Sequence, residues 1–150
     1  AIMASAGQRV LLIDADRQRG SLHRSFGVDD TPGLTELVGG SCTRKEAISA
    51  TKVPGLDLVA AGSAPMDFGE LASSRAFTEL LEHAARDYDV VVLRAPPVLC
   101  SSETLSLAAS AAMVVLVARA RRTAVDDIAQ SARRLTQAGQ LLSGVVLNGV

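Results

Sequence analysis

The stretch Val10-Leu-Leu-Ile-Asp14-Ala-Asp16 decides how the sequence is interpreted. A short apolar run that ends in two carboxylates is typical of a buried strand that delivers acidic side chains to the edge of a sheet, where they can serve a metal or phosphate site. A second run, Val90-Val-Val-Leu-Arg94-Ala-Pro-Pro97, has the composition of a neighbouring strand, but it ends in an arginine. A guanidinium stays protonated and does not ligate a hard cation, so Arg94 stands where this chemistry would favour a third carboxylate.

Short apolar runs alternate with amphipathic stretches along the chain. Strands are predicted near residues 9–14, 56–60, 89–93, 113–118 and 144–147. The clearest helix is predicted over residues 76–86, with Ser73 or Ser74 as its N-cap, and another over residues 123–137, ending at Gly139. Strands that are apolar on both faces and alternate with helices predict an α/β fold, a doubly wound and mainly parallel sheet.

The remaining segments are less regular. Residues 27–51 are rich in Gly, Pro, Ser and Thr and predict an irregular crossover with two short helices, over residues 34–38 and 44–49. Residues 1–7 are typical of the last turns of a helix closed by a glycine. We therefore expect residues 1–150 to form one domain whose first and last elements lie outside this sequence.

Composition and charge exclude several classes of partner. Apolar residues make up 48% of the chain, enough for a core, and fifteen basic against sixteen acidic residues leave no electrostatic footprint for nucleic acid or anionic lipid. The longest apolar runs reach about half of the roughly 20 residues needed to span a bilayer. Cys42 and Cys100 lie far apart, without metal-ligand spacing. A reducing, cytoplasmic setting is the simplest interpretation.

Charged side chains follow several of the predicted strands. Ligands of open α/β sheets bind outside the carboxyl ends of the strands, so Asp14, Asp16, Arg94 and Arg119 are expected to converge on one edge. The alternative is that these groups are solvated strand caps or a structural ion pair.

Residues 11–26, Leu-Leu-Ile-Asp-Ala-Asp-Arg-Gln-Arg-Gly-Ser-Leu-His-Arg-Ser-Phe, resemble the Walker A-prime region of bacterial tyrosine kinases. The resemblance continues through further segments: residues 32–37, 53–58 and 62–74, Tyr88-Asp89, Pro96-Pro97 and residues 144–149. Almost the whole chain is thus similar to the kinase domain of polysaccharide-biosynthesis tyrosine kinases, within the deviant Walker A group of P-loop NTPases that includes ParA and MinD ATPases.

The resemblance implies ATP and Mg²⁺ as cofactors and gives roles to individual residues. Asp14 would organise Mg²⁺, and Asp16 would contact the metal or accept the proton of a tyrosine hydroxyl. Asn148 matches a residue that recognises the adenine edge, although an Asn before Gly149 is equally explained as a turn residue. Arg119 matches an arginine near the base.

The chain also departs from the family pattern. It contains no Gly-x-x-x-x-Gly-Lys phosphate loop, which in the family lies, with the first strand, before the position of residue 1, so a truncated sequence and a true loss explain its absence equally well. Gln18 stands where an arginine is usual, between Arg17 and Arg19. Arg94 aligns with the Walker B aspartate, which predicts impaired Mg²⁺-dependent phosphoryl transfer. Arg94 would then pair with Asp14 or Asp16, or contact a phosphate directly. The alternative is that Arg94 is a neutral substitution in a site that has lost its activity.

These observations predict a kinase-like ATP-binding domain of a tyrosine autokinase, catalytically impaired, which leaves open whether the chain is an active enzyme. The alternatives are a non-catalytic interaction module of the exopolysaccharide export machinery and a ParA/MinD-type partitioning ATPase. The resemblance implies a membrane chain-length regulator, fused or separate, and like subunits in a ring as partners, and a place at the inner face of the plasma membrane. Tyr88 is the only tyrosine, so this sequence contains no tyrosine-rich acceptor tail.

Overall fold

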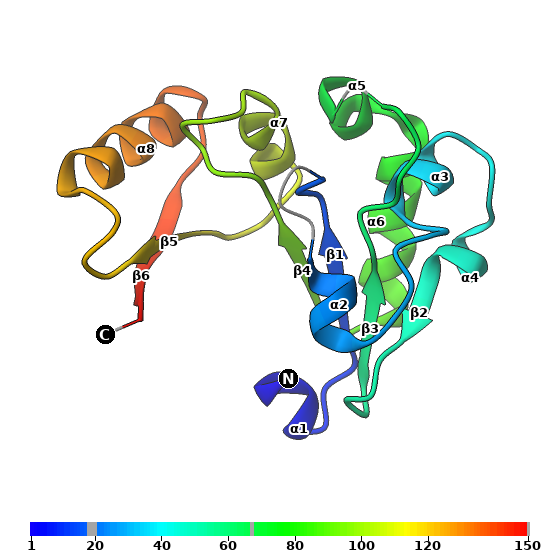
Figure 1. Cartoon of the computed structure of the whole chain (residues 1–150). Coiled ribbons are helices and arrows are strands. Elements are labelled where there is room, and N and C mark those ends of the chain that lie inside the picture. Colours follow the sequence, from blue (N-terminus) through cyan, green and yellow to red (C-terminus); the bar gives the residue numbers. More distant parts are fainter. Residues whose placement is uncertain (18–20, 67, 150) are drawn as a thin grey trace. The chain divides into compact units, whose positions relative to one another are not determined.

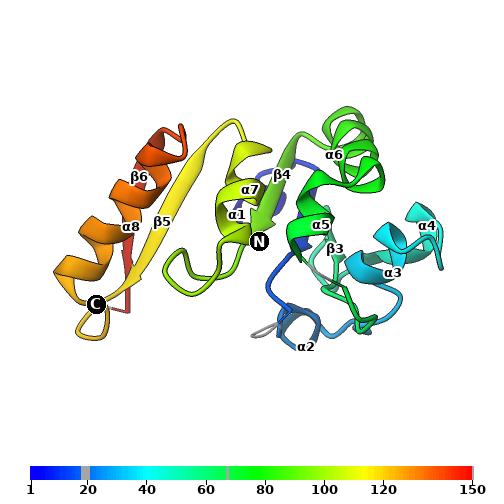
Figure 2. The same cartoon turned by 90° about the horizontal axis from the view of Figure 1, so that it is seen from above.

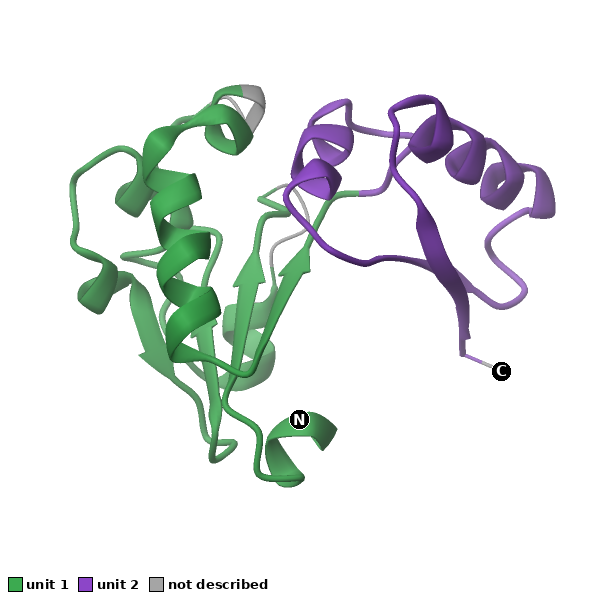
Figure 3. Cartoon of the chain, turned by 180° about the vertical axis from the view of Figure 1, so that it is seen from behind, with its two compact units in different colours: residues 1–96 green, residues 97–150 purple. Residues whose placement is uncertain are grey.

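The structure, a computed structural model, describes residues 1–17, 21–66 and 68–149. It divides into two compact units, residues 1–96 and residues 97–150 (Figure 3). Each unit is described by itself below. That the two together belong to one domain stays a prediction.

Unit 1 is built on a four-stranded sheet. Its strands are β1 (Val10–Asp14), β2 (Ile48–Ala50), β3 (Leu56–Val59) and β4 (Val90–Arg94). The strand order is β2-β3-β1-β4, in which β1 runs parallel to β3 and to β4, and β2 is antiparallel to β3. The predicted mainly parallel α/β sheet is confirmed, with β1, the strand of the opening motif, as an interior strand.

Helices cover both faces of this sheet. They are α1 (Ile2–Ser5), α2 (Leu22–Phe26), α3 (Leu34–Val38), α4 (Arg44–Ala47), α5 (Phe68–Ser73) and α6 (Arg75–Asp87). Val10 packs with Ala4 of α1, Phe26 of α2 and Leu56 on one face. Leu11 points to the other face because side chains alternate along a strand. Figures 1 and 3, seen from opposite sides, show α2 in front of one face and α6 in front of the other.

The predicted helix over residues 76–86 is confirmed as α6, and its N-cap is Ser74. The Ser74 hydroxyl accepts a hydrogen bond from the amide of Phe77 at 3.1 Å. Phe77, Leu80 and Ala84 of this helix are buried. The spacing of three and four residues therefore placed one apolar stripe of the helix in the core.

The predicted helix over residues 44–49 is wrong at its end. Helix α4 begins with a capping box, in which Thr43 and Glu46 bond to each other's backbone amides, and stops at Ala47. Ile48 has extended backbone, and β2 pairs it with Val59 of β3. The β-branched Ile48 favours extended backbone. The backbone of β3 supplies the hydrogen-bond partners of β2, so the chain leaves the helix at this point.

Unit 2 is a smaller α/β unit. It contains α7 (Glu103–Ala109), β5 (Val114–Arg119), α8 (Val125–Gln137) and β6 (Leu142–Asn148), and β5 runs parallel to β6. Helix α8 runs alongside the two strands (Figure 2), and Leu135 packs against Val114, Leu116 and Leu142. Four valines of the strand pair, Val115, Val117, Val145 and Val146, are exposed. Both predicted strands and the long helix of this unit are confirmed, with ends shifted by one or two residues.

Across the described ranges, every helix is too short or too polar to cross a lipid bilayer.

Candidate functional site

Asp14, Asp16 and Arg94 form one cluster at the carboxyl ends of β1 and β4, called the strand-end cluster below. Asp14 and Arg94 are register partners of the two parallel strands. Nη1 of Arg94 donates to both carboxylate oxygens of Asp14, each at 3.0 Å, and Nη2 donates to Oδ2 of Asp16 at 3.1 Å. One guanidinium therefore holds both carboxylates that the sequence singled out.

The backbone fixes the geometry of the strand-end cluster. The amide of Ala15 donates to the carbonyl of Arg94 at 2.8 Å, which continues the ladder between the strands by one residue. The amide of Asp16 donates to Oδ1 of Asp14 at 3.1 Å, so the chain turns immediately after the strand. The parallel register and this turn bring the two carboxylates to the same guanidinium.

The strand-end cluster is nearly dry on its acidic side. Asp14 and Asp16 are 1% and 3% exposed, whereas the Arg94 side chain is 29% exposed. Burial raises the pKa of Asp14, and the amide of Asp16 and the Arg94 guanidinium oppose that rise. A buried carboxylate without a cation would cost several kcal/mol, so the Arg94 guanidinium stabilises the negative charge of Asp14.

Arg94 occupies the carboxylate oxygens that a Mg²⁺ ion would use as ligands. Magnesium needs oxygen ligands at about 2.0–2.1 Å in a near-octahedral shell. The carboxylate oxygens of Asp14 and Oδ2 of Asp16 already accept from Arg94, whose positive charge would repel the ion. Within the described ranges, no group of three or more His, Cys, Asp or Glu side chains comes close enough to hold a metal ion. The assignment of Asp14 and Asp16 as metal ligands and catalytic groups stays a prediction.

Arg119 and Asn148 lie together in unit 2. They are register partners at the carboxyl ends of β5 and β6, and the amide of Ala120 donates to the carbonyl of Asn148 at 2.8 Å. Both side chains are exposed. The turn after β5 is closed by Thr123, whose hydroxyl accepts from the Arg119 amide at 2.9 Å. The contact of Arg119 and Asn148 with a nucleotide stays a prediction.

Other predicted positions are peripheral or lie outside the described residues. Arg17 is exposed, and Gln18 and Arg19 fall outside the described ranges. Tyr88 is partly buried, and its hydroxyl donates to Oδ2 of Asp57 on β3 at 2.7 Å. Tyr88 thus connects the start of β4 to a strand two places away in the sheet.

The sequence interpretation missed a second anchor at the carboxyl edge of unit 1. The Glu36 carboxylate accepts from the amides of Gly33 at 2.9 Å, Ser63 at 2.9 Å and Ala64 at 2.8 Å. It thereby attaches the first turn of α3 to the loop that follows β3, and we call this contact the loop clamp. Burial alone would raise the pKa of Glu36, but these amides outweigh it and hold the pKa at about 2.

Gly62 of the same loop has a φ of +82°, and an added Cβ would collide with the side chains of Glu36 and Thr35. The available sequence signal was a glutamate three residues after Gly33, the pattern of a helix N-terminus. That pattern predicts the bond to Gly33 but not the two bonds to the loop.

Comparison with known proteins identifies the family of the chain. A family model described as an AAA domain matches residues 1–142. The chain belongs to this family of P-loop domains. The match runs through both compact units and includes the strand ends that carry Asp14, Arg94 and Arg119.

The relatives are bacterial tyrosine kinases. The tyrosine-protein kinase ptk of Acinetobacter johnsonii is 36% identical over 149 residues, which are 99% of this chain and 20% of that protein. The chain therefore spans about a fifth of the length of this curated relative. Among solved structures, the BceF tyrosine kinase domain matches with a TM-score of 0.88 at 37% identity, over 99% of this chain and 60% of that chain.

The kinase domain of the Escherichia coli tyrosine kinase ETK matches with a TM-score of 0.94 at 34% identity, over 99% of this chain and 58% of that chain. MinD of Pyrococcus horikoshii, solved with Mg-ADP, matches with a TM-score of 0.76 at 21% identity, which shows a shared fold alone. The recognition of the chain as similar to bacterial tyrosine kinases, with MinD-like neighbours, is confirmed.

Proposed function

We propose that residues 1–150 are part of the kinase domain of a tyrosine autokinase in exopolysaccharide or capsule biosynthesis, and that Arg94 impairs its Mg²⁺-dependent phosphoryl transfer. The observation that carries the proposal is the strand-end cluster. A guanidinium that bonds both oxygens of Asp14 and one oxygen of Asp16 occupies the position where a third carboxylate would help to bind Mg²⁺.

In this proposal the nucleotide is ATP, and the exposed Arg119 and Asn148 side chains meet its base at the carboxyl ends of β5 and β6. Ligand binding at that edge is the rule for open parallel sheets. The Asn148 amide offers both a donor and an acceptor, as the adenine edge requires. Arg94 contributes positive charge near the phosphates, and Asp14 and Asp16 hold that guanidinium in place.

The partners follow from the same proposal. The chain would work at the inner face of the plasma membrane, with a membrane chain-length regulator, fused or separate, and with like subunits in a ring. The kinase relatives, about five times as long as this chain, leave room for a fused segment. The higher identity to kinases than to MinD supports the kinase assignment over a partitioning ATPase.

A second candidate is a non-catalytic interaction module that docks on active relatives or on the regulator. The ion pairs of the strand-end cluster favour it, because a site whose carboxylates are already neutralised by a guanidinium does not need a metal to be stable.

Calorimetric binding of ATP and ADP, with and without Mg²⁺, tests the proposal on the natural full-length protein. We expect Mg²⁺ to leave the affinity unchanged in the native protein and to raise it in Arg94→Asp, where three carboxylates face the ion. Robust turnover of Mg-ATP by the native protein would refute the impairment. Absence of nucleotide binding in both proteins would favour the interaction module.

A further inference from the structure

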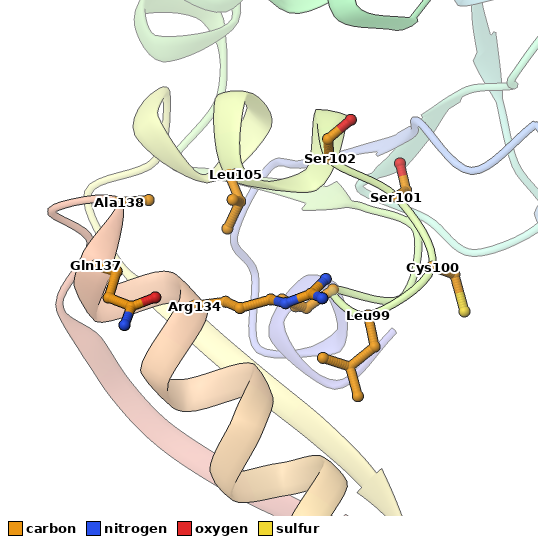
Figure 4. Close-up of a pocket in the computed structure, with 9 residues that line it drawn as sticks. Leu99, Cys100, Ser101, Ser102, Leu105, Arg134, Gln137 and Ala138 are labelled. Atoms are coloured by element: carbon orange, nitrogen blue, oxygen red, sulfur yellow. The ribbon is translucent and has the colours of Figure 1, made fainter.

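A cavity of about 520 Å³ lies within unit 2, between the loop that leads into α7 and the C-terminal turns of α8. None of its lining belongs to the strand-end cluster or to the Arg119–Asn148 pair. Figure 4 shows the residues around it: Val98, Leu99, Cys100, Ser101, Ser102, Leu105, Arg134, Gln137 and Ala138. Its volume falls within the range of small-ligand sites.

The walls of this cavity combine an apolar surface with one cation. Val98 is 8% exposed and belongs to the core of unit 2, with Leu105 packed against the same core cluster. The Arg134 side chain extends from α8 towards Leu99, and the Leu105 side chain points into the same space (Figure 4). The cavity therefore offers an apolar contact and a guanidinium to a single ligand.

Arg134 has its charge available for that ligand. In the part of the chain that the structure describes, no carboxylate lies within 4 Å of its guanidinium. Glu103, the first residue of α7, follows the loop that lines the cavity, and its carboxylate accepts a hydrogen bond from the Ser101 hydroxyl. Gln137, one helical turn after Arg134, adds an amide donor at the rim.

We propose that this cavity binds a phosphotyrosyl side chain of a partner polypeptide. The aromatic ring would pack against Leu99 and Leu105, and the phosphate would accept hydrogen bonds from Arg134, whose planar fork fits phosphate oxygens. A free phosphate would leave the apolar walls in water, and an unmodified tyrosine would leave the guanidinium without an anion. An aryl phosphate satisfies both.

The proposal deepens the proposed function and rests on it in one respect, because a phosphotyrosine is the product that a tyrosine kinase makes. A catalytically impaired chain that binds phosphotyrosine would distinguish phosphorylated from unphosphorylated active relatives. The cavity would then be the docking point for a phosphorylated segment.

Titration of the chain with N-acetyl-O-phosphotyrosine amide, followed by NMR chemical shifts of the backbone amides, tests the proposal. Inorganic phosphate and N-acetyltyrosine amide serve as comparison ligands. We expect shifts at residues 98–105 and 134–138, and an affinity for the aryl phosphate at least about tenfold above that for either comparison ligand.

Arg134→Gln should weaken binding by about tenfold or more, since it removes the charge-assisted hydrogen bonds. Arg133→Gln is the matched control, because Arg133 is the exposed neighbour on the same helix and does not line the cavity. Equal weakening by both variants, binding of phosphate alone, or no binding of the aryl phosphate would overturn the proposal. ATP binding, measured separately on the full-length protein, shows whether the proposed function fails with it.

Discussion

Replacing Arg94 with alanine is the most direct perturbation of the strand-end cluster. The variant leaves two carboxylates, 1% and 3% exposed in the native chain, without the guanidinium that bonds three of their oxygens. Breaking a buried ion pair by removing one partner costs about 3–5 kcal/mol. Because the Arg94 side chain is itself 29% exposed, we expect a loss near the lower value, about 3 kcal/mol.

That loss is large compared with the stability of a small domain. Globular domains unfold with about 5–15 kcal/mol, and 1 kcal/mol shifts the melting temperature of a chain of about 150 residues by roughly 2–4 °C. Arg94→Ala should therefore lower Tm by about 6–12 °C. The Arg44–Asp87 ion pair, whose side chains are 40% and 59% exposed, gives the control: Arg44→Ala should change stability by less than about 1 kcal/mol.

The deficit should depend on pH. Burial already raises the pKa of Asp14, and without Arg94 that pKa rises further above the ordinary value of 3.8. A carboxyl whose folded pKa exceeds its unfolded pKa favours the folded state at low pH and loses that contribution as pH rises through the folded pKa. The variant should thus lie closest to the native protein below about pH 4 and furthest from it near pH 7.

Urea unfolding followed by circular dichroism, from pH 4 to 8, measures both effects. A deficit near 3 kcal/mol at pH 7 that shrinks on acidification supports a buried, charge-balancing role for Arg94. A deficit below about 1 kcal/mol, or one that stays constant over this pH range, would show that the aspartates are as solvated as a surface pair.

Three further changes are predicted for unit 1. Glu36→Gln should lower the free energy of unfolding by about 1–2 kcal/mol. The pKa of Glu36 is about 2 in the native chain against 4.5 in the unfolded chain, so urea unfolding should show the native protein to be more stable than the variant above about pH 4.5. This advantage should disappear as pH falls through about 2. Gly62→Ala should cost about 2 kcal/mol or more by urea unfolding, well above Gly139→Ala, whose added Cβ meets nothing within 4 Å. Tyr88→Phe should lower the free energy of unfolding by about 1 kcal/mol, measured by thermal unfolding. Burial and the hydrogen bond to Asp57 raise the pKa of Tyr88, so an absorbance titration should show tyrosinate forming only well above the ordinary value of 10.

Local patterns were enough to predict the elements that carry the candidate site. Apolar runs located β1 and β4, and the rule that parallel strands share a carboxyl edge brought Arg94 to Asp14, its register partner. The spacing of apolar residues located α6, and a serine before it supplied the cap. These features depend on residues within one turn or one strand, so a single sequence contains them.

Contacts between distant segments were beyond the sequence. Strand β2 has three residues, and Ile48 becomes a strand residue only because Val59 lies beside it in the folded sheet. The bonds from Ser63 and Ala64 to Glu36 likewise need the loop after β3 to meet α3. Both depend on tertiary pairing, which overrides local propensity. The catalytic, metal and nucleotide roles of Asp14, Asp16, Arg94, Arg119 and Asn148 stay predictions, because they concern ligands rather than the fold.

The two-stranded sheet of unit 2 has a consequence for how the chain opens. Strands β5 and β6 pair with each other, so in each strand only the amides that face its partner belong to that ladder. Unit 1 has a four-stranded sheet with helices on both faces, whereas the exposed valines of β5 and β6 contribute little burial to unit 2. Local opening free energies follow such differences in buried contact. Among the strands, amide hydrogen exchange should therefore be faster in β6 than in β1, the interior strand of the sheet of unit 1.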